Sequence, residues 1–600
     1  MADGRTRFRV WAPRAKRVEL RLLATGRHAE RVLPLDPAER GYFVGEHEAG
    51  AGDRYVYRLD GAAERPDPAS RSQPDGVHEP SAIVDPSVHA WLDGSWRGVP
   101  LERLVIYELH VGTFSREGTL DGVVPHLGRI AELGVTAIEL MPIAQFPGSR
   151  NWGYDGVFPY AVQSSYGGPE ALRRLADACH ARGLALILDV VYNHLGPEGN
   201  VLAEFGPYFS DRHKTPWGAA INFDGPDSDE VRHFFVQNAL HWIREHHLDA
   251  LRLDAIHGIV DTSAEPFLAE LASSVRALGR ELGRDVLVIA ESDLNDPRVV
   301  RPRELGGHGL DAQWSDDFHH ALHAALTGER AGYYEDFGRL DELATAYRQG
   351  FVYAGQRSAH RRRRHGAPPD AVPGERFVVA IQNHDQVGNR ALGERLSTLV
   401  DFESLKLAAG ALLVAPFVPL LFMGEEYADP APFLYFIDHS DPGLIDAVRR
   451  GRRAEFASFA WQAEVPDPQA PETFERSRLD PALATHGRHA ALRSLYRALL
   501  TLRREHPALA HLSREDTYAD ADDASRLLRL TRGPRADALA FLNFAETPAH
   551  GSALAAGGPW RLRIDTSSEL WAGPGGSAPP GLSASERLEL NPRSFVLYTT

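Results

Sequence analysis

The chain has 600 residues and a formal net charge of −17, with 65 Lys and Arg residues against 82 Asp and Glu residues. Such a length predicts several domains, because a single hydrophobic core stops growing well before this size. An acidic chain does not attract phosphate backbones, so we expect no nucleic-acid partner. The single cysteine excludes an intramolecular disulfide and a Cys-rich metal site.

The sequence carries no targeting or membrane signal. It lacks the apolar segment of a signal peptide near its start. No window approaches the roughly 18 uninterrupted apolar residues of a membrane-spanning helix. We therefore expect no membrane partner and predict a cytoplasmic location.

The first part of the chain reads as β-structure. Apolar and polar residues alternate in Phe8–Trp11, Val18–Leu22 and Tyr55–Leu59, the period of half-buried strands. We predict an N-terminal β-sandwich over residues 1–88. Its segment Phe8–Pro13 resembles the carbohydrate-binding-module-like domain that precedes the barrel in branching and debranching enzymes. The Pro-rich stretch 66–86 predicts a linker at the end of this domain.

From about residue 102, short apolar runs alternate with longer helical patterns. Eight such runs with intervening amphipathic stretches are the pattern of a (β/α)₈ TIM barrel, which we predict over residues 89–510. The runs are Leu104–Leu109, Ala137–Met141, Ala185–Val191, Ala250–Asp254, Val286–Ala290, Gly309–Trp314, Phe377–Asn383 and Pro419–Met423. The helical stretches include Gly168–Ala181, Asp229–His246, Glu265–Leu282 and Ala490–Glu505.

Two insertions interrupt the alternation, at about residues 195–227 and 427–488, and both are expected to cap the carboxyl end of the barrel. The run Arg361–Arg364 lies among Gly and Pro residues and predicts a solvated loop. Residues 511–600 return to β character and predict a C-terminal β-sandwich. The predicted fold class is therefore multidomain α/β with a central TIM barrel.

Charged side chains gather at the predicted carboxyl ends of the barrel strands, which all point to one face. Arg252 and Asp254 lie two apart on a strand, so their side chains share a side of it. The arginine favours the ionised carboxylate that a glycosidic nucleophile requires. Glu291 follows an apolar strand, which predicts a raised pKa and an acid role. Asp385 ends another strand.

Aromatic side chains are the other requirement of a sugar site, because the C–H faces of sugar rings pack on aromatic rings. Tyr154 follows the second barrel strand and Trp217 lies in the first insertion. The sequence contains no motif of the other common reaction classes: it has no phosphate-binding P-loop, no HExxH zinc helix and no nucleophile-elbow serine.

Four segments resemble the signature regions of the α-amylase superfamily, glycoside hydrolase family 13: Asp189–His194, Leu251–Asp254 with His257, Glu291-Ser292 and Asn383–Asp385. Further segments resemble its maltooligosyltrehalose trehalohydrolase subfamily: Asn151–Gly156, Asp316–His320, Gln382–Arg390 with Gly393–Leu396, and Val465–Gln469. Members of that subfamily hydrolyse the α-1,4 bond next to a terminal trehalose unit. The resemblance implies a retaining glycoside hydrolase that acts on maltooligosyl trehalose, after a maltooligosyl trehalose synthase.

By the same resemblance, Asp254 is the nucleophile, Glu291 the proton donor and Asp385 the stabiliser of the transition state. Asp317 and His319 are our candidates for hydrogen bonds to the trehalose unit. The residues expected to contact substrate are Tyr154, His194, Arg252, His257, Asp316, Asp317, His319, His384 and Gln386, with Trp217 as a further platform. The short first insertion lacks the bulk of a calcium-binding lid, so we expect no metal, and no cofactor is implied.

Two alternatives stay open on the sequence. A glycogen branching or debranching enzyme would share the barrel and its carboxylates, but the subfamily-like segments argue against it. A non-catalytic glucan-binding protein would have lost at least one of Asp254, Glu291 and Asp385, and all three are present.

Overall fold

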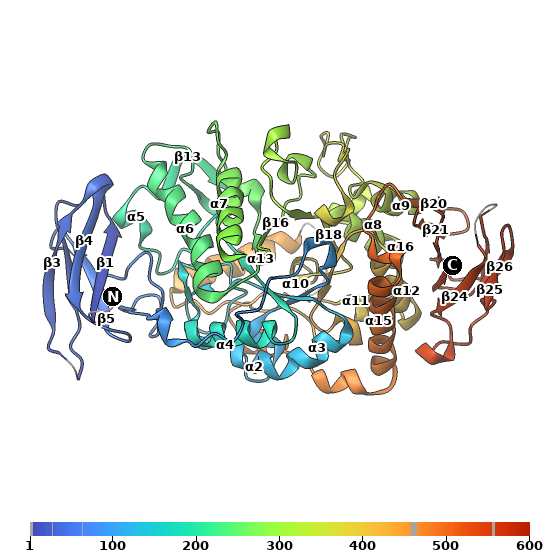
Figure 1. Ribbon diagram of the computed structural model, residues 1–600, viewed down its shortest axis with the longest axis horizontal. Coiled ribbons are helices and arrows are strands. Elements are labelled where there is room, and N and C mark those ends of the chain that lie inside the picture. The colour runs from blue at the N-terminus through green and yellow to red at the C-terminus, as the bar shows by residue number, and fades with distance from the viewer. Residues whose placement is uncertain (1–3, 27, 63, 458–464, 555–557) are drawn as a thin grey trace.

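The computed structural model describes residues 4–600 except 27, 63, 458–464 and 555–557. It has three parts in a row: an N-terminal antiparallel sheet, a central barrel and C-terminal antiparallel sheets (Figure 1). This arrangement confirms the predicted fold class.

The N-terminal part is built from seven strands. In the sheet they follow the order β1-β4-β3-β2-β5-β6, with β7 paired to β5. Their inward positions, among them Phe8, Val18, Leu20 and Tyr57, are buried. The strands are β1 (Arg5–Trp11), β2 (Val18–Leu22), β3 (Arg31–Pro37), β4 (Tyr42–Glu48), β5 (Arg54–Leu59), β6 (Glu64–Arg65) and β7 (Ser81–Ala82).

The stretch 66–86, expected to be a linker, is instead packed against this sheet. The buried Asp67 carboxylate accepts hydrogen bonds from the Tyr55 hydroxyl and the Ala69 N–H, each at 2.8 Å. Ser81 and Ala82 add a short strand to β5. Proline and glycine correctly predicted turns here, but not the buried polar contacts that hold the turns in place.

The barrel closes through eight parallel strands in the order β12-β15-β16-β17-β18-β19-β8-β9. Each predicted apolar run contains one of them, apart from a one-residue difference at Pro419. The strands are β8 (Ile106–Leu109), β9 (Ala137–Leu140), β12 (Ala185–Val190), β15 (Ala250–Leu253), β16 (Leu287–Ala290), β17 (Ala312–Trp314), β18 (Phe377–Ala380) and β19 (Val418–Phe422). The predicted helices are confirmed as α4 (Gly168–His180), α6 (Ser228–His246), α7 (Phe267–Leu282) and α15 (Gly487–Glu505).

The barrel interior changes from apolar to polar along the strands. Ile187, Ala250 and Ile289 belong to one buried apolar cluster inside the barrel. Side chains two residues further along a strand point to the same side, and these are Asp189, Arg252 and Glu291. The inward side chains are therefore apolar in the first part of these strands and charged at their carboxyl ends.

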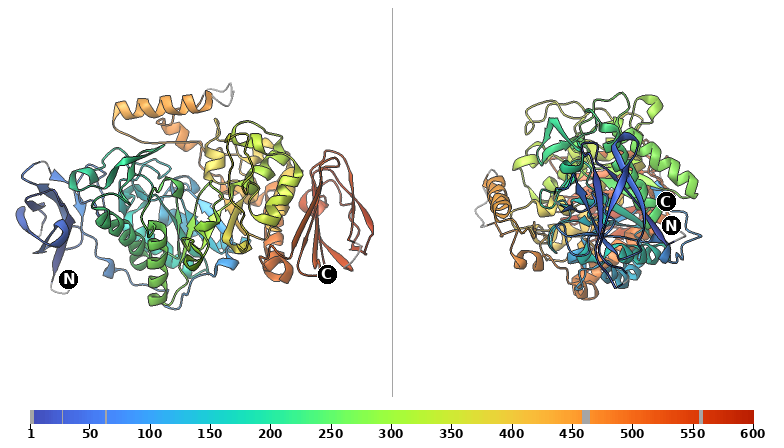
Figure 2. Two further views of the ribbon diagram at one scale, coloured as in Figure 1. Left: turned by 90° about the horizontal axis from the view of Figure 1, so that it is seen from above. Right: turned by 90° about the vertical axis from the view of Figure 1, so that its left-hand side faces the viewer.

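Both insertions reach that end of the barrel. The first forms the hairpin β13 (Phe209–Thr215) and β14 (Gly218–Ile221). The second contains α13 (Pro442–Ala457), the orange helix along one side of the molecule in the left view of Figure 2. Arg452 on α13 donates to the Gly388 carbonyl at 3.0 Å, just beyond strand β18. Residues 458–464, which precede Val465, lie outside the described part of the chain.

The C-terminal part is antiparallel. Six strands follow the order β20-β21-β22-β27-β24-β25, and β23 (Ala549–Ser552) pairs with β26 (Arg587–Leu590). The strands of the larger sheet are β20 (Thr517–Asp522), β21 (Leu527–Arg532), β22 (Ala538–Asn543), β24 (Trp560–Asp565), β25 (Gly581–Leu582) and β27 (Ser594–Thr599). The limits 1–88, 89–510 and 511–600 stay a prediction. Within the described residues, no helix is both long and apolar enough to span a bilayer.

Candidate active site

The buried guanidinium of Arg252 is the centre of the charged layer. Its Nη1 lies 2.9 Å from Asp254 Oδ1 and 2.7 Å from Asp189 Oδ2, and its Nη2 lies 3.7 Å from Glu291 Oε2. The guanidinium also lies over the Trp314 ring, 4.4 Å from its centroid. One cation therefore touches the ends of three neighbouring strands and fixes the directions of their carboxylates.

Asp254 is held from two sides. Arg252 donates to one oxygen, and the Asn193 amide donates to the other, Oδ2, at 2.6 Å. Asn193 also donates to the Asp254 carbonyl at 2.8 Å. The carboxylate is thus aimed by two strand ends, and its 8% exposure leaves it accessible from the carboxyl face of the barrel.

Glu291 is placed by an unusual turn after Asp254. Ala255 has φ of 38°, in the left-handed region, and its N–H donates to Glu291 Oε2. Burial raises the pKa of Glu291 well above its ordinary value, and the nearby Asp254, Asp385 and Asp316 raise it further, while Arg252 opposes them. The direction of this pKa shift agrees with the raised pKa expected from the sequence.

Asp385 is the most open of the three carboxylates, with a side chain 40% exposed. Its Oδ1 lies 3.6 Å from His384 Nε2 and accepts from the Asn389 amide at 3.3 Å. Asp385 is therefore open to solvent, and among the described residues its ion-pair partner is His384, at this longer distance.

His384 is buried beneath these groups. Its Nδ1 lies 2.5 Å from Glu108 Oε1, and its Nε2 lies 2.6 Å from the Tyr154 hydroxyl. Burial lowers the pKa of His384, but Glu108 and Asp385 outweigh it and bring the pKa to about 9. The Tyr154 ring stacks on the His384 ring at 24°, and its hydroxyl donates to Asp189 at 2.6 Å.

Asp316 begins α8 (Asp316–Thr327) beside the cleft. Burial and the neighbouring Asp385, Asp293 and Asp317 raise the pKa of Asp316 to about 7. The Gln386 amide lies 3.4 Å from Asp316 Oδ1. Asp316 and Gln386 therefore lie together near Asp385, as the sequence predicted for substrate contacts.

An aromatic rim borders the carboxylates. The Trp217 ring stacks on the His194 ring with centroids 5.4 Å apart, and it lies 6.0 Å from His257. Trp217 is 46% exposed, so one face of the indole is open to solvent. The structure thus brings Trp217, His194 and His257 together on the predicted side of the barrel.

Asp317 and His319 do not offer the substrate contacts proposed for them. Asp317 Oδ2 accepts from the N–H groups of Val352 and Tyr353 and from the Asn295 amide, each at 2.8 Å. His319 lies 2.5 Å from the Ile381 carbonyl and 2.9 Å from the Tyr334 hydroxyl, so both ring nitrogens are occupied. Both side chains are buried and hold the wall of the cleft, and we withdraw their assignment to trehalose.

Three residues near the site were missed. Asn193 lies inside a signature segment, and Glu108 stands at an inward position of a buried strand, so the sequence held signals for both. Arg361 was expected in a solvated loop, and its three neighbours Arg362 to Arg364 are exposed. Arg361 itself is paired with Asp293 at 2.9 Å, close behind Glu291.

Nothing in the described part of the chain forms a group of three or more His, Cys, Asp or Glu side chains that could hold a metal ion. The absence of a metal and of a cofactor from the reaction stays a prediction. The chemistry that these residues support by themselves is acid–base and nucleophilic attack by carboxylates.

Two family models match the chain. The catalytic-domain model of α-amylase matches residues 67–216, and carbohydrate-binding module 48, the isoamylase N-terminal domain, matches residues 1–83. With its closed barrel and the carboxylates at its carboxyl end, the protein is a glycoside hydrolase of the α-amylase class.

Curated relatives narrow the class. The malto-oligosyltrehalose trehalohydrolase of Saccharolobus solfataricus is 50% identical, with 84% of this chain and 86% of the relative aligned. That of Arthrobacter ramosus is also 50% identical, over 88% and 91%. The chain belongs to the malto-oligosyltrehalose trehalohydrolase family. By contrast, a 1,4-α-glucan branching enzyme of Xanthomonas euvesicatoria pv. vesicatoria is 26% identical, over 95% and 76%.

Solved structures agree on the fold. A putative α-amylase from Salmonella typhimurium superimposes with a TM-score of 0.87 at 36% identity, covering 99% of this chain and 98% of that one. A pullulanase from Paenibacillus barengoltzii reaches 0.72 at 21% identity, covering 100% and 94%, which supports the fold alone.

Proposed function

We propose that this protein cleaves the α-1,4-glucosidic bond next to the terminal trehalose of maltooligosyl trehalose and releases trehalose. The observation that carries the chemistry is the pair of unlike carboxyl groups around Arg252. Asp254 is held by two donors, whereas desolvation and the neighbouring carboxylates raise the pKa of Glu291. One group suits a nucleophile and the other an acid. The identity of the substrate is inferred from the family to which the chain belongs.

In the first step, an Asp254 oxygen attacks C1 of the glucosyl unit at the cleaved bond. The bond from C1 to the glycosidic oxygen breaks, and Glu291 transfers its proton to that oxygen, so trehalose leaves with a complete hydroxyl. Asp385, exposed toward the cleft, stabilises the positive charge that develops on the sugar ring.

In the second step, the Glu291 carboxylate takes a proton from water, and the water oxygen attacks C1. The C1–Asp254 bond breaks, Asp254 returns as a carboxylate, and the glucan leaves with the α configuration retained. Two inversions at C1 give this retention.

Recognition of trehalose is assigned to groups that lie open near the carboxylates. Trp217 offers a ring face, and Asp316 with Gln386 offers hydrogen-bond donors and acceptors. A site that pairs the hydroxyls of both trehalose rings rejects maltose, because the unmatched buried polar groups are costly. Tyr154 and His257 complete the proposed contacts.

The substrate requires an earlier enzyme that converts the reducing end of a maltooligosaccharide into a trehalose unit, a maltooligosyl trehalose synthase. We propose that this protein acts after it. The cytoplasmic location inferred from the sequence stays a prediction.

A branching or debranching enzyme is the second candidate. The lower identity to the branching enzyme relative, 26% against 50%, favours the trehalohydrolase. The test compares kcat/KM on maltotriosyl trehalose with kcat/KM on maltopentaose, a plain chain of equal length. We expect a large preference for the capped chain and no transfer to branch points. Equal values for both chains would reduce the protein to a general α-glucan hydrolase.

A further inference from the structure

Glu139 is a buried carboxyl group that the mechanism above does not use. It stands on β9, two residues beyond Ala137 of the apolar cluster inside the barrel, so its side chain points into the barrel interior. Only 1% of the residue is exposed, and among the described residues neither carboxyl oxygen has a hydrogen-bond partner. A buried polar group without a partner costs free energy, so packing alone does not explain a glutamate at this position.

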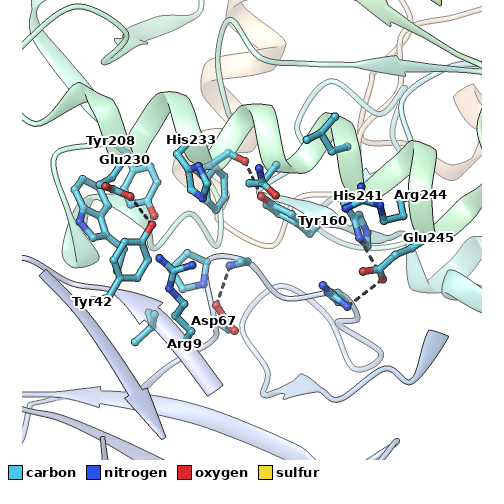
Figure 3. Close-up of a pocket in the computed structure, with 18 residues that line it drawn as sticks. Arg9, Tyr42, Asp67, Tyr160, Tyr208, Glu230, His233, His241, Arg244 and Glu245 are labelled. Atoms are coloured by element: carbon cyan, nitrogen blue, oxygen red, sulfur yellow. Dashed lines mark hydrogen bonds and ion pairs between the residues drawn. The ribbon is translucent and has the colours of Figure 1, made fainter. Parts of the chain in front are cut away.

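Two other buried glutamates show the usual arrangement. Glu230, beside the N-terminal sheet, accepts from the Tyr42 hydroxyl at 2.6 Å (Figure 3). Glu108 is the register partner of Glu139 on the neighbouring strand β8, and both of its oxygens contact His384. Glu139 lacks such a contact although it lies next to Glu108 in the same barrel.

A connected set of side chains lies above Glu139 and ends at the nucleophile. Strand β9 lies between β8 and β12, and Glu139 is in register with Ile187, one inward position below Asp189. Neighbouring members of the set contact each other at 2.5–2.9 Å. In order, they are Glu108, His384, Tyr154, Asp189, Arg252 and Asp254. Glu139 therefore stands below the middle of this set.

The Arg252 guanidinium is held on one side only. Its hydrogen bonds to Asp189, Asp254 and the Tyr154 hydroxyl all leave from Nη1. Among the described residues, Nε and Nη2 have no hydrogen-bond partner. A planar group that is held through one nitrogen can still turn about that nitrogen, so the orientation of Asp254 needs a second support.

The unpaired atoms of this layer complement one another. The donors are Arg252 Nε and Nη2 and the indole Nε1 of Trp314, over whose ring the guanidinium lies. The acceptors are the two oxygens of Glu139 and Asp189 Oδ1. A buried water molecule typically makes about three hydrogen bonds to such groups. Ordered water can therefore join Glu139 to Arg252 and Asp189.

Glu139 is also within electrostatic reach of these groups. Burial raises the pKa of Glu139 well above its ordinary value, and Glu108 and Asp189 raise it further, while Arg252 and His384 oppose them. This direction favours the neutral carboxyl group, which both donates and accepts hydrogen bonds. Such a group can hold water against a cation and a carboxylate at the same time.

We propose that Glu139 is a positioning residue for the nucleophile, because it holds ordered water against Arg252 and thereby fixes the orientation of Asp254. The role rests on the proposed function, since it concerns the same nucleophile. Glu139 touches no substrate and acts only through the guanidinium. Its loss should therefore slow turnover more than it weakens substrate binding.

The test compares Glu139→Gln, which keeps a hydrogen-bonding side chain of the same shape, with Glu139→Leu, which has none. The matched control is Ile187→Val, because Ile187 is the register partner of Glu139 on β12 and belongs to the apolar cluster. For each protein, kcat and KM are measured across pH on maltotriosyl trehalose and on α-maltotriosyl fluoride. Fluoride leaves without a proton from Glu291, and its release needs no recognition of trehalose. A high-resolution crystal structure of the parent locates ordered water.

We expect ordered water between Glu139 and Arg252 in the parent. Glu139→Leu should lower kcat on both substrates by about 10- to 100-fold while KM stays near the parental value. Its acidic limb of kcat should move to higher pH, because a loosened guanidinium favours the Asp254 carboxylate less. Glu139→Gln and the control should keep kcat and the pH profile close to those of the parent.

Parental kinetics in Glu139→Leu, or an equal loss in Glu139→Gln, overturns the proposal. The same loss in Ile187→Val assigns the effect to packing and also overturns it. If the Leu variant does not fold, Glu139→Met replaces it, and a parent crystal without the bridging water contradicts the role whatever the variants do. If the fluoride is cleaved but the capped chain is not, the proposed function fails, and the role of Glu139 is still decided on the fluoride.

Discussion

Arg252 Nη1 donates to Asp254 Oδ1 at 2.9 Å from the neighbouring inward position of the same strand. The same atom reaches Asp189 at 2.7 Å, and the guanidinium is fully buried. The aim of the nucleophile thus depends on a planar cation with two nitrogens in fixed positions, which a lysine ammonium does not reproduce.

Arg252→Lys should retain the positive charge but no longer hold the Asp254 carboxylate in its orientation. A displacement of about 1 Å can cost about 100-fold in rate, so we expect kcat to fall by about that factor. Arg252→Ala should also unfold more easily, by roughly 3–5 kcal/mol, because buried carboxylates lose their partner. Kinetics and denaturant titration separate the two effects. A Lys variant with parental kcat would leave Arg252 a structural role only.

Asn193 should be a positioning residue for Asp254. Asn193→Ala removes the donor to Oδ2, and we expect kcat to fall by about 10- to 100-fold with little change in KM. Asn200→Ala, in the neighbouring loop, serves as control because its amide contacts only loop backbone. Equal kcat values in the two variants would show that Arg252 alone is enough to position Asp254.

Glu108 should control the protonation of His384. The folded pKa of His384, about 9, lies above its unfolded value. The pair therefore stabilises the protein fully below about pH 6.5, and this stability is lost as pH rises through 9. The contribution is about 3 kcal/mol by that shift. Glu108→Gln should flatten the decline of stability between pH 6.5 and 9.

Thermal unfolding of both proteins across this pH range measures the effect. Glu108→Gln should also shift the alkaline limb of the kcat profile to lower pH, since Tyr154 and Asp385 both lie beside His384. Parallel stability curves for the parent and the variant would disprove the coupling between Glu108 and His384.

Trp217 should contribute to binding and little to stability. Its ring is half exposed and stacks on His194, so Trp217→Ala should raise KM for the capped chain while the melting temperature stays near the parental value. Trp217→Phe keeps a ring face and should recover much of the loss. An unchanged KM in the Ala variant would remove Trp217 from the substrate site.

Asp317 should behave in the opposite way. Its Oδ2 holds two backbone N–H groups and one amide, so Asp317→Ala should lower stability by about 1–3 kcal/mol for the donors left unpaired. Asp316→Ala, its neighbour beside the cleft, should instead raise KM. The reverse pattern would restore Asp317 as a substrate contact.

The sequence predicted the barrel well because buried parallel strands leave short apolar runs between helical patterns. It also predicted the convergence of Asp254, Glu291 and Asp385, since each follows a strand and all strand ends meet on one face. Arg252 followed from the two-residue period of the same strand.

The sequence could not separate Asp316 from Asp317. Both begin a helix, where successive side chains diverge by about 100°, so only one of two neighbours faces the cleft. Which one does so depends on the rotation of α8 against the barrel.

The most direct test of the account follows the cleavage of maltotriosyl trehalose by NMR, which resolves the anomeric protons of each product as it forms. The account predicts trehalose and the α-anomer of maltotriose in equal initial amounts, with the β-anomer appearing later by mutarotation. Initial formation of the β-anomer would contradict the double displacement at Asp254. Release of maltose or glucose in place of trehalose would contradict the proposed cleavage site.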